Sequence, residues 1–198
     1  MRQNTENRLR KEIAQEAAKL VAVDGLEDYL QAKKKAADQL GIYDKRVYPS
    51  NSEIEVALIE YQSLFQNNQQ KDELLELRKT AYKTMVLLKD YQPRLVGPVL
   101  TGTANQYSEI TIHLFCDTPE LVSLFLEQEG IPTSICERRI KLEKNKILYF
   151  TSFKFLAGDI NVVLTVMPLS YIKTLPLDPV TGNTMKRAKT KDVLRLIE

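Results

Sequence analysis

The sequence predicts an α+β fold in which a helical N-terminal region packs on a mixed β-sheet domain. Apolar residues recur at helical spacing through about the first ninety residues, and strand-like alternation replaces this spacing after Pro93. The chain of 198 residues is long enough for a domain with a helical appendage. We therefore expect a helical region at 1–92 and a sheet domain, with a C-terminal tail and a short helix, at 93–198.

Four helices are expected in the N-terminal region, over residues 8–23, 26–40, 50–65 and 72–89. Gly25 and Gly41 end the first two, because glycine adopts the left-handed conformation of a helix C-terminus at little cost. Ser50 and Glu53 have the spacing of a capping box, in which each side chain bonds a free amide of the first helical turn. Pro93 ends the fourth helix, because proline disfavours helical geometry in the residue before it.

The C-terminal region is expected to combine short extended segments with one helix. Extended segments are predicted at 94–100, 109–115, 134–142, 147–155 and 159–167, with turns at Asn145 and at 157–158. Thr118 and Pro119 open a helix over 120–129, since proline is favoured at the first helical position. The tail at 168–188 has no clear period, and a last helix is predicted over 191–197.

The composition is typical of a soluble globular protein. Hydrophobic residues make up 43% and charged residues 27%, so the chain can bury a core without disulfides or metals. Cys116 and Cys136 lack metal-ligand spacing, and we expect reduced thiols in a cytoplasmic protein. No apolar run approaches the roughly 20 residues of a membrane-spanning helix, so no membrane insertion is expected. The net charge of +2 does not by itself indicate nucleic-acid binding, and the oligomeric state stays open.

Residues 96–112, VGPVLTGTANQYSEITI, are the most informative segment of the chain. A hydrophobic residue and Gly97 precede a turn-rich run with Gly102, and a short alternating strand follows. This layout resembles the active-site signature of the polymerase-β-like nucleotidyltransferases, where Gly-Ser is followed by an Asp-hydrophobic-Asp strand. The whole chain is similar to small bacterial nucleotidyltransferase-like proteins, through segments 13–18, 32–37, 49–57, 93–97, 102–104, 137–139 and 181–188. The resemblance implies a nucleotidyltransferase-like sheet domain.

The chemistry of the signature is altered at three positions. Pro98 stands where serine is expected, and Glu109 and Thr111 stand where the two aspartates are expected. Mg²⁺ prefers carboxylate oxygens, and on the strand face formed by Glu109, Thr111 and His113 only one residue is a carboxylate. Weak metal occupancy would remove roughly two to four orders of magnitude in rate. The pattern therefore favours a catalytically degenerate protein, a pseudoenzyme, that binds a protein partner or another macromolecule and needs no cofactor.

The alternative is an active nucleotidyltransferase that uses Mg²⁺. Glu109 and Asp159 would then be the catalytic metal ligands, if the strand register brings them close. His113, the only histidine, would be the general base, although a strand histidine bonded to a neighbour is the simpler interpretation. For a bound nucleotide, the candidate phosphate contacts are Gly97, Gly102, Thr103, Arg138, Arg139 and Lys141.

A weaker alternative is a nucleic-acid-binding module. Two basic clusters could contact phosphates: Arg138, Arg139, Lys141, Lys144 and Lys146 on and after one strand, and Lys186, Arg187, Lys189 and Lys191 in the tail. Ordinary solvated charge is the simpler interpretation of both clusters. Neither has the interleaved aromatic residues on which single-stranded nucleic acids stack.

Overall fold

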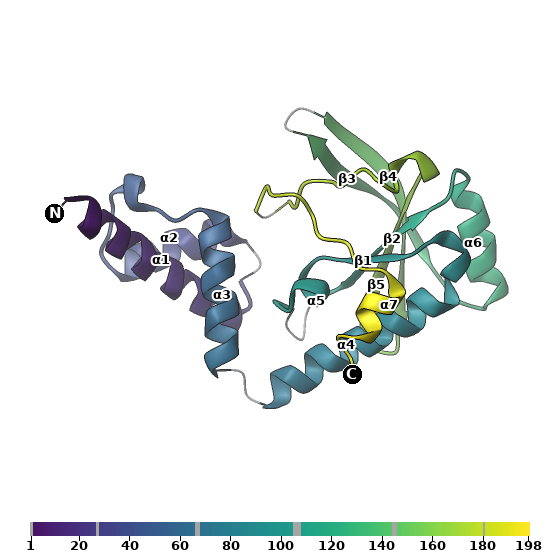
Figure 1. Cartoon of the computed structure of the whole chain (residues 1–198), viewed down its shortest axis with the longest axis horizontal. Helices are drawn as coiled ribbons and strands as arrows, with labels where there is room; N and C mark the ends of the chain where they lie inside the picture. Colours follow the sequence, from purple (N-terminus) through teal and green to yellow (C-terminus); the bar gives the residue numbers. More distant parts are fainter. Residues whose placement is uncertain (1, 27, 66–67, 105–107, 144–145, 180) are drawn as a thin grey trace. The chain divides into compact units, whose positions relative to one another are not determined.

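The computed structural model describes residues 2–26, 28–65, 68–104, 108–143, 146–179 and 181–198, which form seven α-helices and a five-stranded mixed sheet (Figure 1). The expected α+β class is therefore confirmed. The chain divides into two compact units, Met1–Lys71 and Asp72–Glu198. Within the described ranges, no helix is both long enough and apolar enough to cross a bilayer.

The N-terminal unit contains α1 (Arg2–Asp24), α2 (Tyr29–Gln39), the 3₁₀ turn η1 (Lys45–Val47) and α3 (Asn51–Phe65). Small side chains dominate its core, which lets the helices approach closely; the buried residues include Ala14, Ala17, Ala18, Ala32, Ala36, Ala37, Ile13, Ile54 and Leu58. The predicted capping box is present. The amide of Ser50 donates to Glu53 Oε2 at 2.7 Å, and the amide of Glu53 donates to Ser50 Oγ at 3.2 Å.

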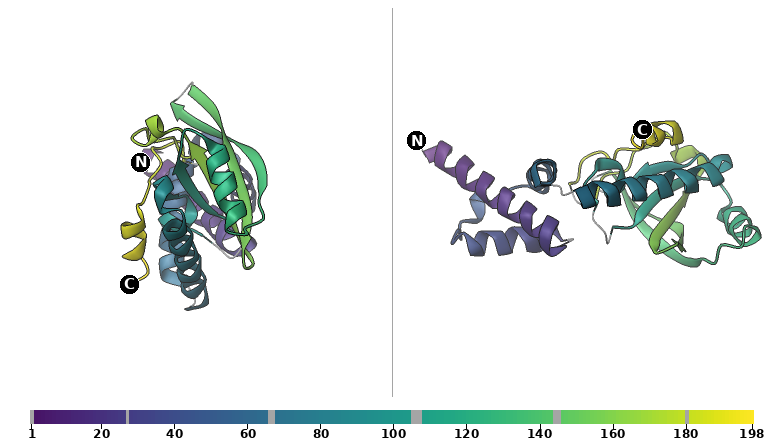
Figure 2. Two further views of the ribbon diagram at one scale, coloured as in Figure 1. Left: turned by 90° about the vertical axis from the view of Figure 1, so that its right-hand side faces the viewer. Right: turned by 90° about the horizontal axis from the view of Figure 1, so that it is seen from below.

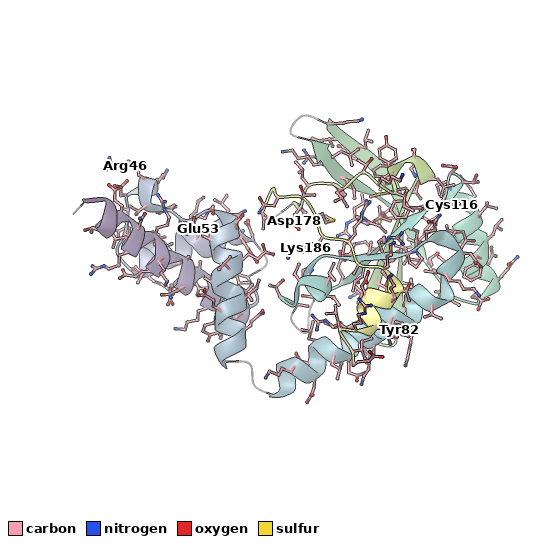
Figure 3. All side chains as sticks on the ribbon, viewed as in Figure 1. Arg46, Glu53, Tyr82, Cys116, Asp178 and Lys186 are labelled. Atoms are coloured by element: carbon pink, nitrogen blue, oxygen red, sulfur yellow. The ribbon has the colours of Figure 1, made fainter. Side chains whose placement is uncertain are left out.

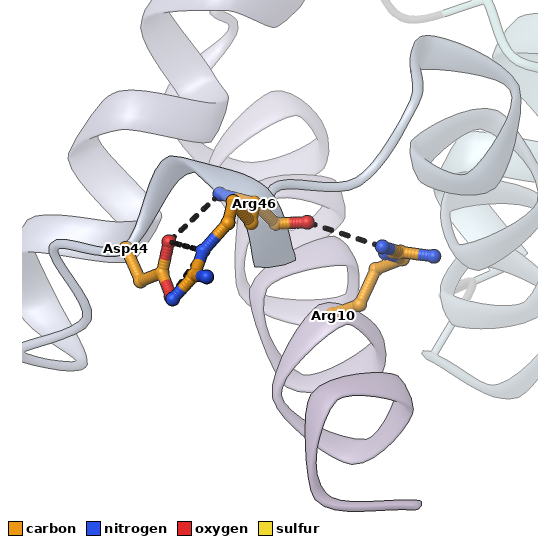
Figure 4. A network of polar contacts seen from close by, with 3 residues as sticks. All are labelled: Arg10, Asp44 and Arg46. Carbon is orange, nitrogen blue, oxygen red and sulfur yellow. Dashed lines mark hydrogen bonds and ion pairs between the residues drawn. The ribbon is translucent and has the colours of Figure 1, made fainter. Parts of the chain in front are cut away.

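The segment between α2 and α3 is tied to α1 by a small polar network (Figure 4). The guanidinium of Arg46 donates to both carboxylate oxygens of Asp44, with its shortest contact at 2.7 Å. Arg10 in α1 donates from Nη2 to the carbonyl oxygen of Arg46 at 3.1 Å. The Asp44–Arg46 pair is exposed, so we expect it to add little stability and mainly to orient η1.

The C-terminal unit is built on a sheet with strand order β1-β2-β5-β4-β3. The strands are β1 (Arg94–Val96), β2 (Ile110–Phe115), β3 (Ser134–Glu143), β4 (Lys146–Ala157) and β5 (Ile160–Met167). The β2–β5 pair is parallel, whereas the other three pairs are antiparallel. The helices are α4 (Asn68–Leu87), α5 (Pro98–Thr101), α6 (Pro119–Gln128) and α7 (Thr190–Leu194), with 3₁₀ turns η2 (Lys89–Tyr91) and η3 (Leu169–Tyr171). The turn expected at Asn145 lies outside the described residues.

One face of the sheet, the core face, is covered by helices. Figure 2 shows α4 lying along the sheet, and its side chains share a buried cluster with those of α6. The strands supply Leu95, Ile110, Ile112, Leu114, Val162, Leu164, Val166 and Phe153, and the helices supply Leu77, Ala81, Met85, Leu88, Val122 and Leu126. Burial of these side chains contributes the main stabilisation of the unit, at about 1.5–3 kcal/mol for each large residue.

The helix α4 groups with the sheet from Asp72 onwards, whereas the change of hydrophobic period predicts a boundary at 92/93. Its apolar stripe of Leu77, Ala81, Met85 and Leu88 is buried against the strands. The change of hydrophobic period after Pro93 marks where helix gives way to strand. Period alone does not show whether a helix and a strand share one core, which explains the difference.

The opposite face, the site face, carries Thr111, His113, Ser152, Thr165 and Arg138, which the register and the alternation of strand residues place on one side. The tail after β5 closes one end of this face over an apolar cluster of Phe115, Ile140, Leu142, Phe150 and Met167. The amide of Leu177 donates to the carbonyl of Lys141 at 2.7 Å, and Ala188 pairs with Leu95 on β1. The bend between these attachments includes Asp178 (Figure 3).

We predict that a fragment of residues 72–198 folds by itself and that a fragment of residues 93–198 does not. Removal of α4 exposes the core face and deletes three large buried side chains, a loss of about 5–9 kcal/mol that is comparable with the whole stability of a domain. Urea denaturation followed by circular dichroism measures both fragments. A cooperative transition in the shorter fragment, with stability close to that of the longer one, would show that α4 is dispensable.

Candidate functional site

The segment between β1 and β2 begins with a turn that only glycine adopts readily. Gly97 has φ 74° and ψ −159°, a backbone region that is essentially restricted to glycine. A Cβ at Gly97 would meet no atom within 4 Å, so the residue is required for its conformation and not for space. The expectation of an extended segment over 94–100 is wrong after Val96, because this turn and Pro98 at the first helical position start α5.

The amides of this segment bond within the turn itself. Those of Leu100 and Thr101 donate to the carbonyl of Gly97, both at 3.1 Å. Those of Gly102 and Thr103 donate to the carbonyl of Pro98, at 2.8 and 3.0 Å. Pro98 has no amide hydrogen. Four consecutive backbone donors are therefore already used, and a phosphate group would find few of the amides that a phosphate-binding loop supplies.

The carboxylate of Glu109 forms an ion pair with Arg138. Glu109 directly precedes β2, whereas Arg138 lies on β3, and β5 and β4 separate the two strands in the sheet. The pair therefore joins two segments that are not neighbours in the sheet. Both side chains are about two-thirds buried, at 33% and 36% exposed. The acid expected to bind a metal is therefore neutralised by a side chain of the same protein.

Asp159 lies in the two-residue turn between β4 and β5 and is exposed. Because β5 runs parallel to β2 beside it, Asp159 and Glu109 both precede their strands at the same end of the sheet. Among the described residues, no three side chains of histidine, cysteine, aspartate or glutamate are grouped to hold a metal ion. Thr111 offers only a hydroxyl on this face. The residues present therefore do not fit a Mg²⁺ site of the nucleotidyltransferase type.

His113 is buried at the centre of the site face, with 1% of its surface exposed. It lies in register with Thr165 and Ser152, whose hydroxyls hydrogen-bond each other at 3.0 Å. Arg187 Nε donates to His113 Nδ1 at 3.2 Å, so Nδ1 is the acceptor and Nε2 carries the proton of a neutral ring. Burial, and then the charges of Arg187 and Arg138, lower the pKa of His113 to about 3. This bonding leaves no free ring nitrogen to serve as a general base.

Arg187 connects several segments of the site face, a role that its place in a basic cluster did not indicate. Its Nη1 donates to three carbonyl oxygens of the tail, those of Tyr171, Ile172 and Thr174, at 2.9–3.4 Å. The guanidinium also lies 5.1 Å from the centre of the Phe115 ring. Burial and the nearby Arg94 lower the pKa of Arg187 to about 10, so it stays charged at neutral pH.

The predicted phosphate contacts do not gather in one place. Arg138 points to the site face, whereas Arg139 and Lys141 alternate with it on β3 and point to the opposite side, where both are exposed. In the tail, Lys186, Lys189 and Lys191 are exposed while Arg187 points inward. The remaining members of the first cluster, Lys144 and Lys146, lie outside the described residues and at the exposed start of β4, respectively.

We predict that protonation of His113 makes the fold less stable as the pH falls. The folded-state pKa of about 3 lies below the unfolded value near 6.5, so the unfolded chain binds the extra proton and stability is lost below about pH 6.5. The free energy of unfolding should fall by about 1 kcal/mol between pH 7 and pH 5.5, a window above the titration of ordinary carboxylates. Because the chain has one histidine, urea denaturation of His113→Gln should show almost none of this dependence. An equal slope in both proteins would contradict the burial of a neutral histidine.

We predict that Arg187→Ala destabilises the C-terminal unit by more than about 2 kcal/mol, because hydrogen bonds to a charged group contribute about 1.5–3 kcal/mol each. Limited proteolysis should then cleave within the tail. The exposed neighbour provides the control, since Lys186→Ala should change the free energy of unfolding by less than about 0.5 kcal/mol. Equal stability of the two variants would show that Arg187 does not hold the tail.

Searches of protein-family models, of curated proteins and of solved structures found no match to this chain. The resemblance to nucleotidyltransferases therefore stays a prediction from the sequence. Any function assigned to the site face depends on the contacts of the residues that form it.

Proposed function

We propose that the C-terminal unit is a nucleotidyltransferase-like domain that does not transfer nucleotides and that acts by binding a protein partner or another macromolecule. The ion pair between Glu109 and Arg138 carries this proposal. A metal ion would have to displace a partly buried guanidinium from the one carboxylate at the expected position of the catalytic acids. The site face offers few other oxygen ligands for the metal ion, so metal binding would not offset the loss of the ion pair.

The surrounding groups support the same proposal. A nucleotidyl transfer needs donors that hold the phosphates and a base or metal that activates the attacking group. The amides of residues 100–103 donate within their own turn, and His113 has its acceptor nitrogen bonded to Arg187. We also propose that the protein works in the cytoplasm, because Cys116 and Cys136 are both free thiols, as a reducing compartment would keep them.

One observation favours the alternative of an active metal-dependent enzyme. The parallel β2–β5 pair brings Glu109 and Asp159 to the same end of the sheet, so a rearrangement that freed Glu109 from Arg138 would leave two acids there. The nucleic-acid alternative has less support, because Arg139 and Lys141 lie on the opposite side of β3 from Arg138.

We predict no transfer of label from α-labelled nucleoside triphosphates in the presence of Mg²⁺ or Mn²⁺. The full chain should give no more product than Glu109→Ala, which lacks the only carboxylate at the signature strand. The variant Arg138→Gln frees Glu109 without adding a ligand, and we expect it to be inactive as well. Turnover by the wild-type chain that Glu109→Ala abolishes would overturn the proposal in favour of the enzyme.

A further inference from the structure

The guanidinium of Arg138 has an unused donor next to its ion pair. Its Nη2 contacts Glu109, whereas Nη1 is buried and has no hydrogen-bond partner in the described part of the chain. A buried donor without an acceptor is costly, and such atoms in native proteins commonly bond a water molecule or an ion. Arg138 Nη1 therefore requires a hydrogen-bond acceptor close to it.

Positive charge gathers at this point of the sheet. Arg138 and Arg187 both act electrostatically on His113, and Arg94 acts on Arg187. Two carboxylates oppose these three guanidiniums, Glu109 at Arg138 and Asp192 at Arg94. Among the described residues, the hydrogen-bond acceptors of Arg187 are uncharged, namely carbonyls, the methionine sulfur of Met167 and the neutral ring of His113. An anionic acceptor is therefore favoured over water at the free donor of Arg138.

Part of the site face, including the Glu109–Arg138 pair, is accessible to solvent. The tail covers the end that carries Phe115 and Met167, whereas Lys154 and Asn161, which point to the same face nearer the start of β2, are exposed. Arg138 and Glu109 keep about one-third of their side-chain surface exposed. A guanidinium presents a planar fork that matches the oxygens of a carboxylate or a phosphate group.

We propose that the site face binds an oxyanion, a carboxylate or phosphate group of a ligand, through the guanidinium of Arg138, in competition with Glu109. The proposal rests on the proposed function, because it assigns chemistry to the face through which the non-catalytic domain would bind a partner. Glu109 competes through charge, because it occupies Nη2 and partly neutralises the same guanidinium whose Nη1 the external oxyanion bonds. Removal of the competitor should therefore strengthen binding, and removal of the guanidinium should abolish it.

The test uses inorganic phosphate and succinate as separate probes of the full chain, at constant ionic strength maintained with sodium chloride. The ring resonances of His113 report binding, because it is the only histidine and lies within the electrostatic reach of Arg138. We expect saturable shifts at millimolar concentrations in the wild-type chain and their loss in Arg138→Gln. A response to phosphate alone identifies a phosphate-bearing ligand, and a response to succinate alone identifies an acidic side chain.

The chain supplies a matched control in Arg139→Gln, which removes the same charge from the neighbouring residue on the opposite side of β3 and should leave binding unchanged. In Glu109→Gln, affinity should rise by up to about fivefold, the effect of a partly exposed ion pair. Thermal unfolding shows whether Arg138→Gln is folded, and the gain in Glu109→Gln tests the proposal if it is not.

Two results would overturn the inference: no response in either the wild-type chain or Glu109→Gln, or an equal loss in Arg138→Gln and Arg139→Gln. Nucleotide turnover is measured separately, so the two proposals can fail independently. Anion binding together with turnover would remove only the proposed function. Absence of both would remove only the inference.

Discussion

The arrangement of the site face depends on one buried cation, the guanidinium of Arg187. It joins three segments that are distant in sequence: the tail after β5, the interior strand β2 and the final stretch that pairs with β1. In the part of the chain that the structure describes, its nitrogens donate to uncharged acceptors, so dipoles and the Phe115 ring stabilise the charge. A lysine could not reproduce this planar set of contacts. The neutral state of His113 follows first from its burial and then from the positive charge of Arg187 beside it.

The positive charge of Arg187 also affects the electrostatic potential at β2 and at Glu109, which directly precedes it. A positive potential beneath the site face makes a carboxylate favourable there and a bare metal ion unfavourable. Glu109 meets this condition, and Arg138 then neutralises it from across the sheet. In an active nucleotidyltransferase the carboxylates carry the negative charge and the metal carries the positive charge. In this chain the positive charge beside Glu109 comes from a guanidinium, whereas the Lewis acid of phosphoryl transfer is a metal ion.

The helices and most strands could be predicted because their signals are local. The Ser50–Glu53 capping box, the glycines at helix ends and the alternation of β2 and β5 all follow from neighbouring residues. The parallel pairing of β2 with β5 and the place of α4 on the sheet are non-local, and period gives no information on either. The opposite orientation of Arg138 and Arg139 does follow from strand alternation, once residues 134–142 are taken as a strand. The role of Arg187 could not be predicted, because an inward arginine among exposed lysines has the same sequence pattern as a solvated basic cluster.

The presence of Gly97 and Gly102 between β1 and β2 has a structural explanation that involves no nucleotide. The chain must leave β1, turn and return to the start of β2, which runs antiparallel beside it. Gly97 provides the sharp change of direction in a backbone region that side chains disfavour, and Gly102 ends α5 in the left-handed conformation with φ 89°. Alanine at either position would strain this connection whether or not a phosphate were bound. Pro98 suits this turn by itself, because proline is favoured at the first position of a helix. Resemblance in the glycines therefore indicates a shared connection between strands, whereas activity has to be judged from the carboxylates and their partners.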